Sequence, residues 1–124
     1  MNITQIQLVS LPVSDQDRAR DFYVNTLGLE LVRDNPMDEN SRWVQVAPKG
    51  AATSVTLVTW FATMPPGSAK GLVLQTADVD GDRERLRRAG VTVSDPQDAP
   101  WGRYVTLDDP DGNGIVLAGP PPSS

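Results

Sequence analysis

Three aspartates close to the C-terminus are the first residues whose spacing could support chemistry. Asp108, Asp109 and Asp111 lie in the stretch Asp-Asp-Pro-Asp-Gly-Asn. Neighbouring carboxylates can act as an acid–base pair or bind Ca²⁺, but these three lack an EF-hand's full ligand set and its terminal Glu. Pro110 and Gly112 favour a tight turn, in which Asp side chains bond nearby backbone amides. We therefore expect these carboxylates to shape a hairpin turn.

Arg103 is the strongest single polar candidate for contact with a ligand. Its planar guanidinium could hold a carboxylate, a phosphate or an enolate oxygen. The alternative is a structural salt bridge with the acidic loop around Asp95 or Asp98. Both roles fit the sequence.

Aromatic and amide side chains form a second group of candidates. Trp43 and Trp60 could stack against a planar or cationic ligand, or they could fill the interior or a dimer contact. Gln45 and Gln75 could contact a ligand through their amides, or they could be buried and bonded to each other. The ligand-binding residues that we expect are Trp43, Gln45, Trp60, Gln75, Trp101 and Arg103.

Composition narrows both the chemistry and the class of partner. The 124 residues include no histidine and no cysteine, which removes the commonest general base, thiolate nucleophiles and the usual transition-metal ligands. The net charge of -5 disfavours binding to nucleic acid or to an anionic membrane surface. The N-terminus lacks the basic and apolar regions of a signal peptide, and no apolar run could span a bilayer. We expect a cytoplasmic protein.

The elements that must position these residues follow one pattern twice. Ser14, with Asp17 three places on, favours the start of a helix that ends at Gly28. Asp78 begins a second helix, which ends at Gly90. Each helix follows one strand and precedes three others. The expected strands are 3–13, 29–33, 43–47, 54–60, 71–76, 91–93, 101–107 and 115–118.

The two halves of the chain are related by an internal duplication. Leu29-Glu-Leu resembles Val91-Thr-Val, and Val55-Thr-Leu resembles Ile115-Val-Leu, each at a separation of about sixty residues. We therefore expect an α+β fold of two tandem βαβββ modules, whose mixed sheets form a cup around a ligand cleft. The expected segments are 1–61 for the first module, 62–70 for a linker, 71–118 for the second module and 119–124 for a disordered tail.

The order of several motifs resembles the vicinal oxygen chelate superfamily, which includes glyoxalase I, extradiol dioxygenases, fosfomycin-resistance transferases and bleomycin-resistance proteins. The resemblance covers residues 3–118 and implies the glyoxalase/bleomycin resistance-like fold, in which paired βαβββ modules form a cup, usually in a homodimer. The motifs are Val-Ser-Asp-Gln-Asp-Arg-Ala at 13–19, Leu-Gly-Leu-Glu-Leu at 27–31, Ala-Asp-Val-Asp at 77–80, Arg-Arg-Ala-Gly-Val at 87–91 and Asp-Pro-Asp-Gly-Asn at 109–113.

The resemblance also implies where a metal ion would bind. In the enzymes of this family, His or Glu residues at four strand positions are the metal ligands. The resemblance carries these positions onto Leu8, Thr56, Gly71 and Val116. None of these residues offers a carboxylate or an imidazole to a divalent metal. We therefore expect neither a metal nor a cofactor.

Several functions fit these observations. The first is a metal-free protein that binds a small organic molecule, aromatic or cationic, as the bleomycin-resistance members do. The second is a metal-independent isomerase, cyclase or lyase acting on a carbonyl compound, with Arg103 at an oxyanion. Glu30 and Asp108 are the candidate carboxylates for that chemistry, although both also fit the surface. The unfilled ligand positions disfavour a metal-dependent glyoxalase or dioxygenase, and a role in protein interaction alone is a fourth hypothesis.

Overall fold

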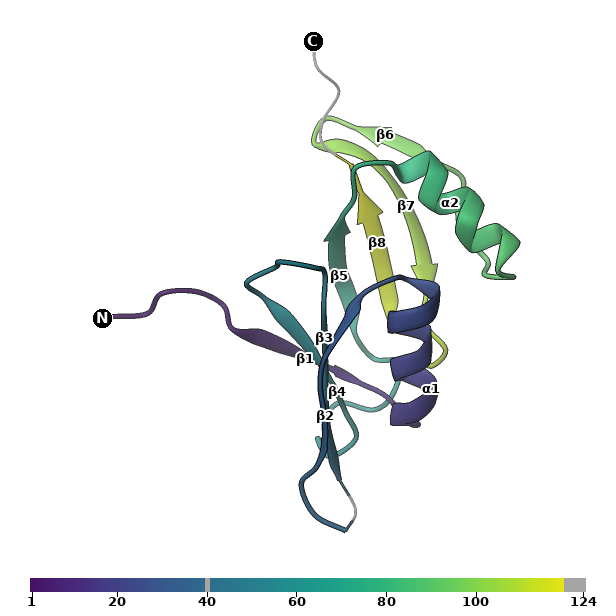
Figure 1. The fold of residues 1–124 in the computed structure, drawn as a ribbon. Helices are drawn as coiled ribbons and strands as arrows, with labels where there is room; N and C mark the ends of the chain where they lie inside the picture. Colours follow the sequence, from purple (N-terminus) through teal and green to yellow (C-terminus); the bar gives the residue numbers. More distant parts are fainter. Residues whose placement is uncertain (40, 120–124) are drawn as a thin grey trace.

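Two four-stranded sheets, each with one helical segment against it, make up the protein (Figure 1). The computed structural model describes residues 1–39 and 41–119. Sheet A consists of β1 Leu8–Pro12, β2 Glu30–Pro36, β3 Arg42–Ala47 and β4 Ser54–Val58. Sheet B consists of β5 Lys70–Gln75, β6 Gln97–Ala99, β7 Gly102–Asp108 and β8 Gly114–Ala118. The helices are α1 Gln16–Asp21, which continues into the π-helical η1 Phe22–Thr26, and α2 Val79–Arg88.

The two sheets repeat one topology. The strand order is β1-β4-β3-β2 in sheet A and β5-β8-β7-β6 in sheet B. In each sheet the first strand of the module runs parallel to the fourth, whereas the other neighbours are antiparallel. One βαβββ connection therefore produces both sheets, which confirms the α+β fold of paired modules that the duplication predicts.

The segment formed by α1 and η1 covers one face of sheet A. Ala19 and Tyr23 are fully buried there. Asp15, rather than the expected Ser14, caps α1, because its carboxylate accepts a hydrogen bond from a backbone N–H of the first turn at 3.1 Å. The Ser14 hydroxyl donates instead to Asp111 in the second module. The residues of sheet A that share the core with this helix are Leu11, Val44, Val46, Val55 and Leu57.

Helix α2 covers the equivalent face of sheet B. Asp78 caps it as expected, and its side chain accepts a hydrogen bond from the backbone N of Gly81 at 3.0 Å. Val79 and Leu86 are buried against the strands. Both helices lie on the same side of the molecule (Figure 1), so the opposite faces of the sheets carry no helix. Across the described residues no helix is long and apolar enough to cross a membrane.

The edge of sheet B differs from the expectation. The strand expected at 91–93 is reduced to a single bridge between Val93 and Leu107. The edge strand is instead β6, which begins directly after Pro96. A proline has no N–H to give to a ladder, so regular pairing starts only after it.

The boundaries near the termini also differ. Only Leu8–Pro12 of the strand expected at 3–13 pairs with β4, and the residues before it form an arm that leaves the body of the protein (Figure 1). Strand β2 runs to Pro36, three residues beyond the expected end of the strand at 29–33. The tail expected at 119–124 falls almost entirely on 120–124, which lie outside the described residues.

The hairpin turn between β7 and β8 is bonded into the first module. The Asp109 carboxylate is 5% exposed and accepts hydrogen bonds from the Tyr23 hydroxyl and the Asn113 amide, both at 2.8 Å. Its other oxygen accepts from the backbone N–H groups of Asp111 and Asn113 at 2.9 Å. Asn113 also donates to the carbonyl of Pro12 in β1 at 2.8 Å. The turn that sets the β7–β8 register therefore also fixes the first module against the second.

These contacts give the aspartates a structural role. Burial, together with the nearby charge of Asp109, raises the pKa of Tyr23 above its ordinary value, so the phenol stays a hydrogen-bond donor. Asp111 accepts from the Ser14 hydroxyl and pairs with Arg18 at 3.1 Å. The prediction that the carboxylates shape a hairpin turn is confirmed for Asp109, whereas Asp111 bonds to the first module and the Asp108 side chain is exposed.

The linker after β4 packs against the same turn through Gly67. Gly67 has a φ of +83°, and a Cβ at this position would overlap the backbone oxygen of Asp111. Gly50 has a similar φ of +76°, but a Cβ there would meet no atom within 4 Å.

We expect Gly50→Ala to lower the free energy of unfolding by about 1 kcal/mol, and Gly67→Ala by about 2 kcal/mol more, because only the second adds a clash. Chemical denaturation of both variants measures the difference, and equal losses would mean that the linker does not press on the turn.

Candidate ligand-binding site

The face of sheet A that points away from α1 carries a row of polar side chains. Strand register places Thr56 between Ser10 and Gln45. It also places Gln45 between Thr56 and Arg33. Paired residues of neighbouring strands point to the same face of a sheet. We call these four residues, one from each strand, the polar row.

Hydrogen bonds fix the middle of the polar row. The hydroxyl oxygens of Ser10 and Thr56 lie 3.0 Å apart. Gln45 accepts a hydrogen bond through Oε1 from Trp43 Nε1 at 2.9 Å. This bond holds the indole beside the row and leaves the Gln45 amide nitrogen as a donor. Trp43 and Gln45 are both half-buried, so a ring and a donor stand side by side on this face.

The equivalent face of sheet B is also aromatic. Register places Ala118 between Gln75 and Tyr104, so these three residues share a face. Trp101 stacks on Tyr104, with ring centroids 4.9 Å apart and an angle of 22° between the planes. The Tyr104 hydroxyl donates to Gln97 Oε1 at 2.9 Å. Tyr104 therefore joins the expected Gln75 and Trp101, although the sequence did not single it out.

Arg103 lies on the other side of sheet B. Val105, two residues along the same strand, is fully buried in the core with α2. The Arg103 guanidinium bonds to Asp80 in α2 at 3.1 Å and to Asp98 in β6 at 3.0 Å, and these carboxylates raise its pKa above the ordinary value. Arg103 was expected among the ligand-binding residues, and its side chain instead points to the helix side of the sheet. The alternative of an ion pair with Asp98 is confirmed, whereas Asp95 pairs elsewhere.

Trp60 and the two glutamines take no part in the ion pairs of Arg103. Trp60 lies two residues beyond β4, is 36% exposed, and makes a tilted ring contact with Phe61 at 6.2 Å. Gln45 belongs to sheet A and Gln75 to sheet B, and Gln45 is bonded to Trp43. Within the described residues the two glutamines are therefore not bonded to each other.

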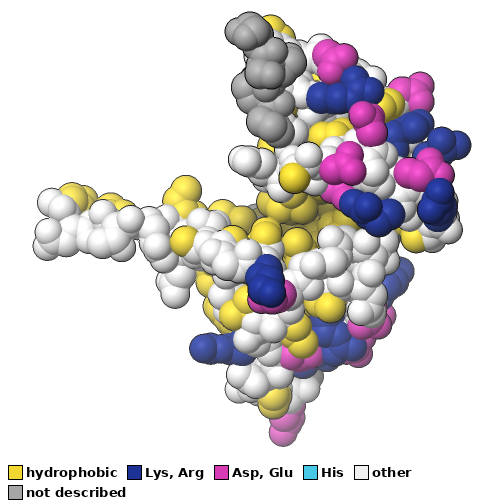
Figure 2. Space-filling view, turned by 45° about the horizontal axis from the view of Figure 1, so that its top comes forward, with side chains coloured by type: hydrophobic (Ala, Val, Ile, Leu, Met, Phe, Trp, Pro, Cys, Tyr) yellow, Lys and Arg dark blue, Asp and Glu magenta, His cyan; other side chains and the backbone are white. Residues whose placement is uncertain are grey.

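Two hollows of the surface lie away from most of these residues. One, of about 590 Å³, lies where η1 approaches the end of β7, and the other, of about 430 Å³, lies between the end of η1 and α2. Figure 2 shows apolar side chains gathered in the cleft between the two modules, with charged side chains on the outer surface. Of the six expected ligand-binding residues only Gln75 lines either hollow. The others lie on the sheet surfaces.

The residues at the family's metal positions do not fit a metal ion. Leu8 and Val116 have no donor atom in their side chains, and the Thr56 hydroxyl is bonded to Ser10. Gly71 is the extra residue of an irregularity in β5. Across residues 1–39 and 41–119, no three His, Cys, Asp or Glu side chains form a group that could hold a metal.

The sequence and the fold together define the family. Residues 5–117 match the sequence model of the Glyoxalase/Bleomycin resistance protein/Dioxygenase superfamily. The paired βαβββ topology agrees with that match. The chain belongs to this superfamily, as its motifs implied.

Individual members resemble the chain over nearly its whole length. TnmS3, an antibiotic binding protein from Streptomyces sp. CB03234, is 56% identical, with a TM-score of 0.93 over 97% of this chain and 98% of that chain. A superfamily member from Sphaerobacter thermophilus DSM 20745 is 40% identical, with a TM-score of 0.87 over 96% and 99% of the two chains. The uncharacterized protein YetH of Bacillus subtilis (strain 168) is 34% identical over 93% of this chain and 98% of its own.

Proposed function

We propose that the protein binds a small planar aromatic molecule on the sheet faces that point away from the helices, and that it holds this molecule without changing it. The observation that carries the proposal is the Trp43–Gln45 pair, in which an aromatic ring and an amide donor stand side by side. Rings bind flat ligands by stacking, and a few placed polar groups orient them. The description of TnmS3 as antibiotic binding supports a role of this kind.

The residues that we propose for contact come from both modules. Trp43 and Gln45 contribute from sheet A, with Trp60 beyond the end of β4. Sheet B contributes Gln75, Trp101 and the residue that Trp101 stacks on, Tyr104. Arg103 is not included, because its guanidinium is bonded to α2 on the other side of the sheet.

We further propose that the protein is a homodimer and that the ligand lies where the two copies meet. Large apolar side chains are exposed on the arm, where Ile3 is 80% and Ile6 is 67% exposed. On sheet B, Val73 is 57% and Trp101 is 54% exposed. Exposed apolar side chains of this kind favour a partner surface, and a second copy would cover them and close the ligand face.

The dimer is tested through the arm. We expect the unaltered protein to sediment as a dimer at micromolar concentration, and the double change Ile3→Asp with Ile6→Asp to weaken the association at least about tenfold, because it places two charges in an apolar contact. Gln5→Asp, on the same arm, is the matched control and should sediment as the unaltered protein does. A monomer at every concentration would contradict the proposal, and so would an undisturbed dimer in the double variant.

Ligand binding is tested with an uncharged planar probe. We expect 1-pyrenemethanol to quench tryptophan fluorescence saturably in the presence of excess EDTA, because no metal is needed for stacking. Chromatography of the mixture should return the probe unchanged. Absence of saturable quenching would contradict binding, whereas conversion of the probe would contradict a purely binding role.

A further inference from the structure

We propose that the ligand carries an anionic oxygen group, a carboxylate or a phenolate, and that Arg33 at the edge of sheet A binds it. This inference rests on the proposed function and names the chemical class of its ligand. The net charge of -5 favours a cationic ligand at first sight. The residues that face the ligand surface of sheet A indicate the opposite charge.

A bulge in β2 turns Arg33 toward the polar row. Leu31 is opposite Val46, whose side chain is in the core, and Arg33 is opposite Gln45. Val32 is the extra residue between these two pairs. In a regular strand Val32 would lie opposite Gln45, and Arg33 would point toward α1. The bulge therefore exchanges an apolar side chain for a guanidinium on the ligand face, and re-aiming a side chain is a common use of bulges.

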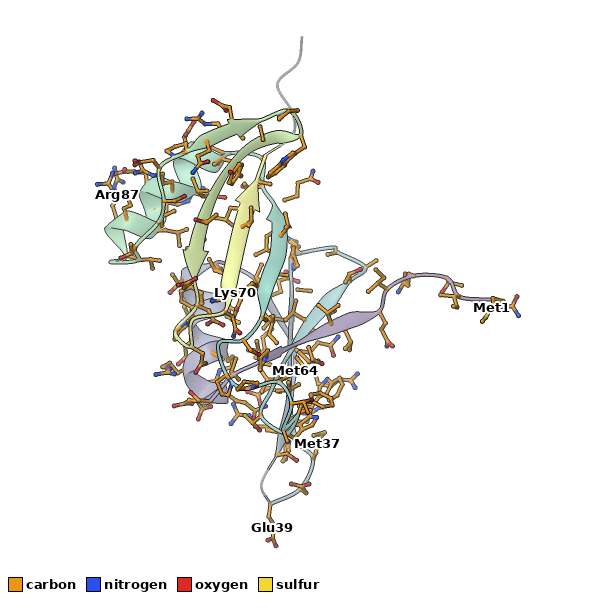
Figure 3. All side chains as sticks on the ribbon, turned by 180° about the vertical axis from the view of Figure 1, so that it is seen from behind. Met1, Met37, Glu39, Met64, Lys70 and Arg87 are labelled. Atoms are coloured by element: carbon orange, nitrogen blue, oxygen red, sulfur yellow. The ribbon has the colours of Figure 1, made fainter. Side chains whose placement is uncertain are left out.

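Arg33 makes no ion pair within the described residues, which sets it apart from most arginines of the chain. Arg87 is the other arginine without a carboxylate partner there, and Figure 3 shows that it projects from the outer side of α2. The arginines that are paired with carboxylates are Arg18, Arg20, Arg42, Arg83, Arg85, Arg88 and Arg103. Arg33 is thus an unneutralised charge on a strand face.

The two carboxylates closest to Arg33 along β2, Asp34 and Glu30, make no ion pair with it. Asp34 lies on the α1 side, where it pairs with Arg20 at 2.8 Å and Arg42 at 2.7 Å. Glu30 is opposite Ala47, about 7 Å further along the sheet than the pair of Arg33. Of these two carboxylates, Asp34 is therefore neutralised on the helix side, and Glu30 shares the face of Arg33 but lies two residues further along the sheet.

Gln45, Ser10 and Thr56 of this face can also donate, whereas Glu30, further along the same face, is an acceptor. The Gln45 carbonyl is used by Trp43, so its amide nitrogen remains to donate. The hydroxyls of Ser10 and Thr56 share one hydrogen bond, which leaves one hydroxyl hydrogen as a further donor, on the half-buried Ser10 or the buried Thr56. A row that ends in a guanidinium and presents donors matches acceptor oxygens, and the planar fork of Arg33 fits a carboxylate in particular.

The test compares three probes with one ring system and different charges. Affinities of 1-pyrenecarboxylate, 1-pyrenemethylammonium and 1-pyrenemethanol are measured by tryptophan quenching at low salt. We expect the carboxylate to bind about tenfold more tightly than the ammonium. Arg33→Gln should weaken binding of the carboxylate about five- to tenfold and leave 1-pyrenemethanol unchanged. Arg87→Gln makes the same change in net charge and should leave all three affinities unchanged.

Three other outcomes would each overturn one part of the proposal. Equal affinities for the three probes, with or without Arg33, would overturn the anionic ligand and leave the binding of planar aromatics standing. Equal effects of Arg33→Gln and Arg87→Gln would assign the preference to overall charge and overturn the role of Arg33. Failure of all three probes to bind would overturn the proposed function and this inference together.

Discussion

Asp109→Ala is expected to lower the free energy of unfolding by about 4 kcal/mol, the largest stability loss of any single change considered for this chain. The carboxylate is buried and accepts hydrogen bonds from the Tyr23 hydroxyl, the Asn113 amide and two backbone N–H groups. Its removal leaves these donors buried without an acceptor, and each such donor costs about 1–3 kcal/mol. Urea denaturation followed by circular dichroism measures the loss.

Asp108→Ala is the matched control, because Asp108 is the adjacent aspartate and its side chain is exposed. We expect this variant to lie within about 0.5 kcal/mol of the unaltered protein. Tyr23→Phe, which removes only one of the donors, should fall between the two. Similar stabilities for the Asp109 and Asp108 variants would contradict the conclusion that this turn holds the two modules together.

Trp43→Ala is expected to weaken the binding of 1-pyrenemethanol about thirtyfold. Truncating an aromatic anchor at the centre of a contact typically costs about 2 kcal/mol, which corresponds to this factor. The change also frees Gln45, which loses the donor that now orients its amide. Titration of the variant by isothermal calorimetry measures the affinity without relying on the missing indole.

Trp43→Phe separates stacking from the hydrogen bond. Phenylalanine keeps a ring but cannot donate to Gln45, so we expect a loss of only about three- to fivefold. Denaturation curves should show that both variants remain folded. An affinity within about twofold of the unaltered protein in Trp43→Ala would place the ligand away from sheet A.

The repeat and its turn could be read from the sequence because their signals are local. The run from Asp109 to Asn113 combines turn residues that act through their own backbone, and the structure has the hairpin where they predict it. The duplicated strand and helix patterns likewise predicted both modules, since each pattern reflects one buried face. The cap of α1 was missed, because Ser14 and Asp15 are both good caps and a distant residue, Asp111, engages the first.

The orientation of the ligand-facing side chains was harder to predict, because it depends on strand register. The connection from β7 to β8 is one residue shorter than the connection from β3 to β4. Tyr104 is therefore the structural counterpart of Trp43. Arg103 precedes Tyr104 by one residue in the strand. Since strand side chains alternate, this slip moves Arg103 to the helix side. The bulge at Val32 brings Arg33 to the ligand face in the same way, and no local sequence signal marks it.

Whether an aromatic anion occupies the face of sheet A is tested most directly by a crystal structure of the protein with 1-pyrenecarboxylate bound. The pyrene ring is expected against the Trp43 indole, with the carboxylate directed at Arg33 and within hydrogen-bond distance of it. A ring found in the hollow between η1 and α2, against Leu86 and Leu117, would contradict this assignment.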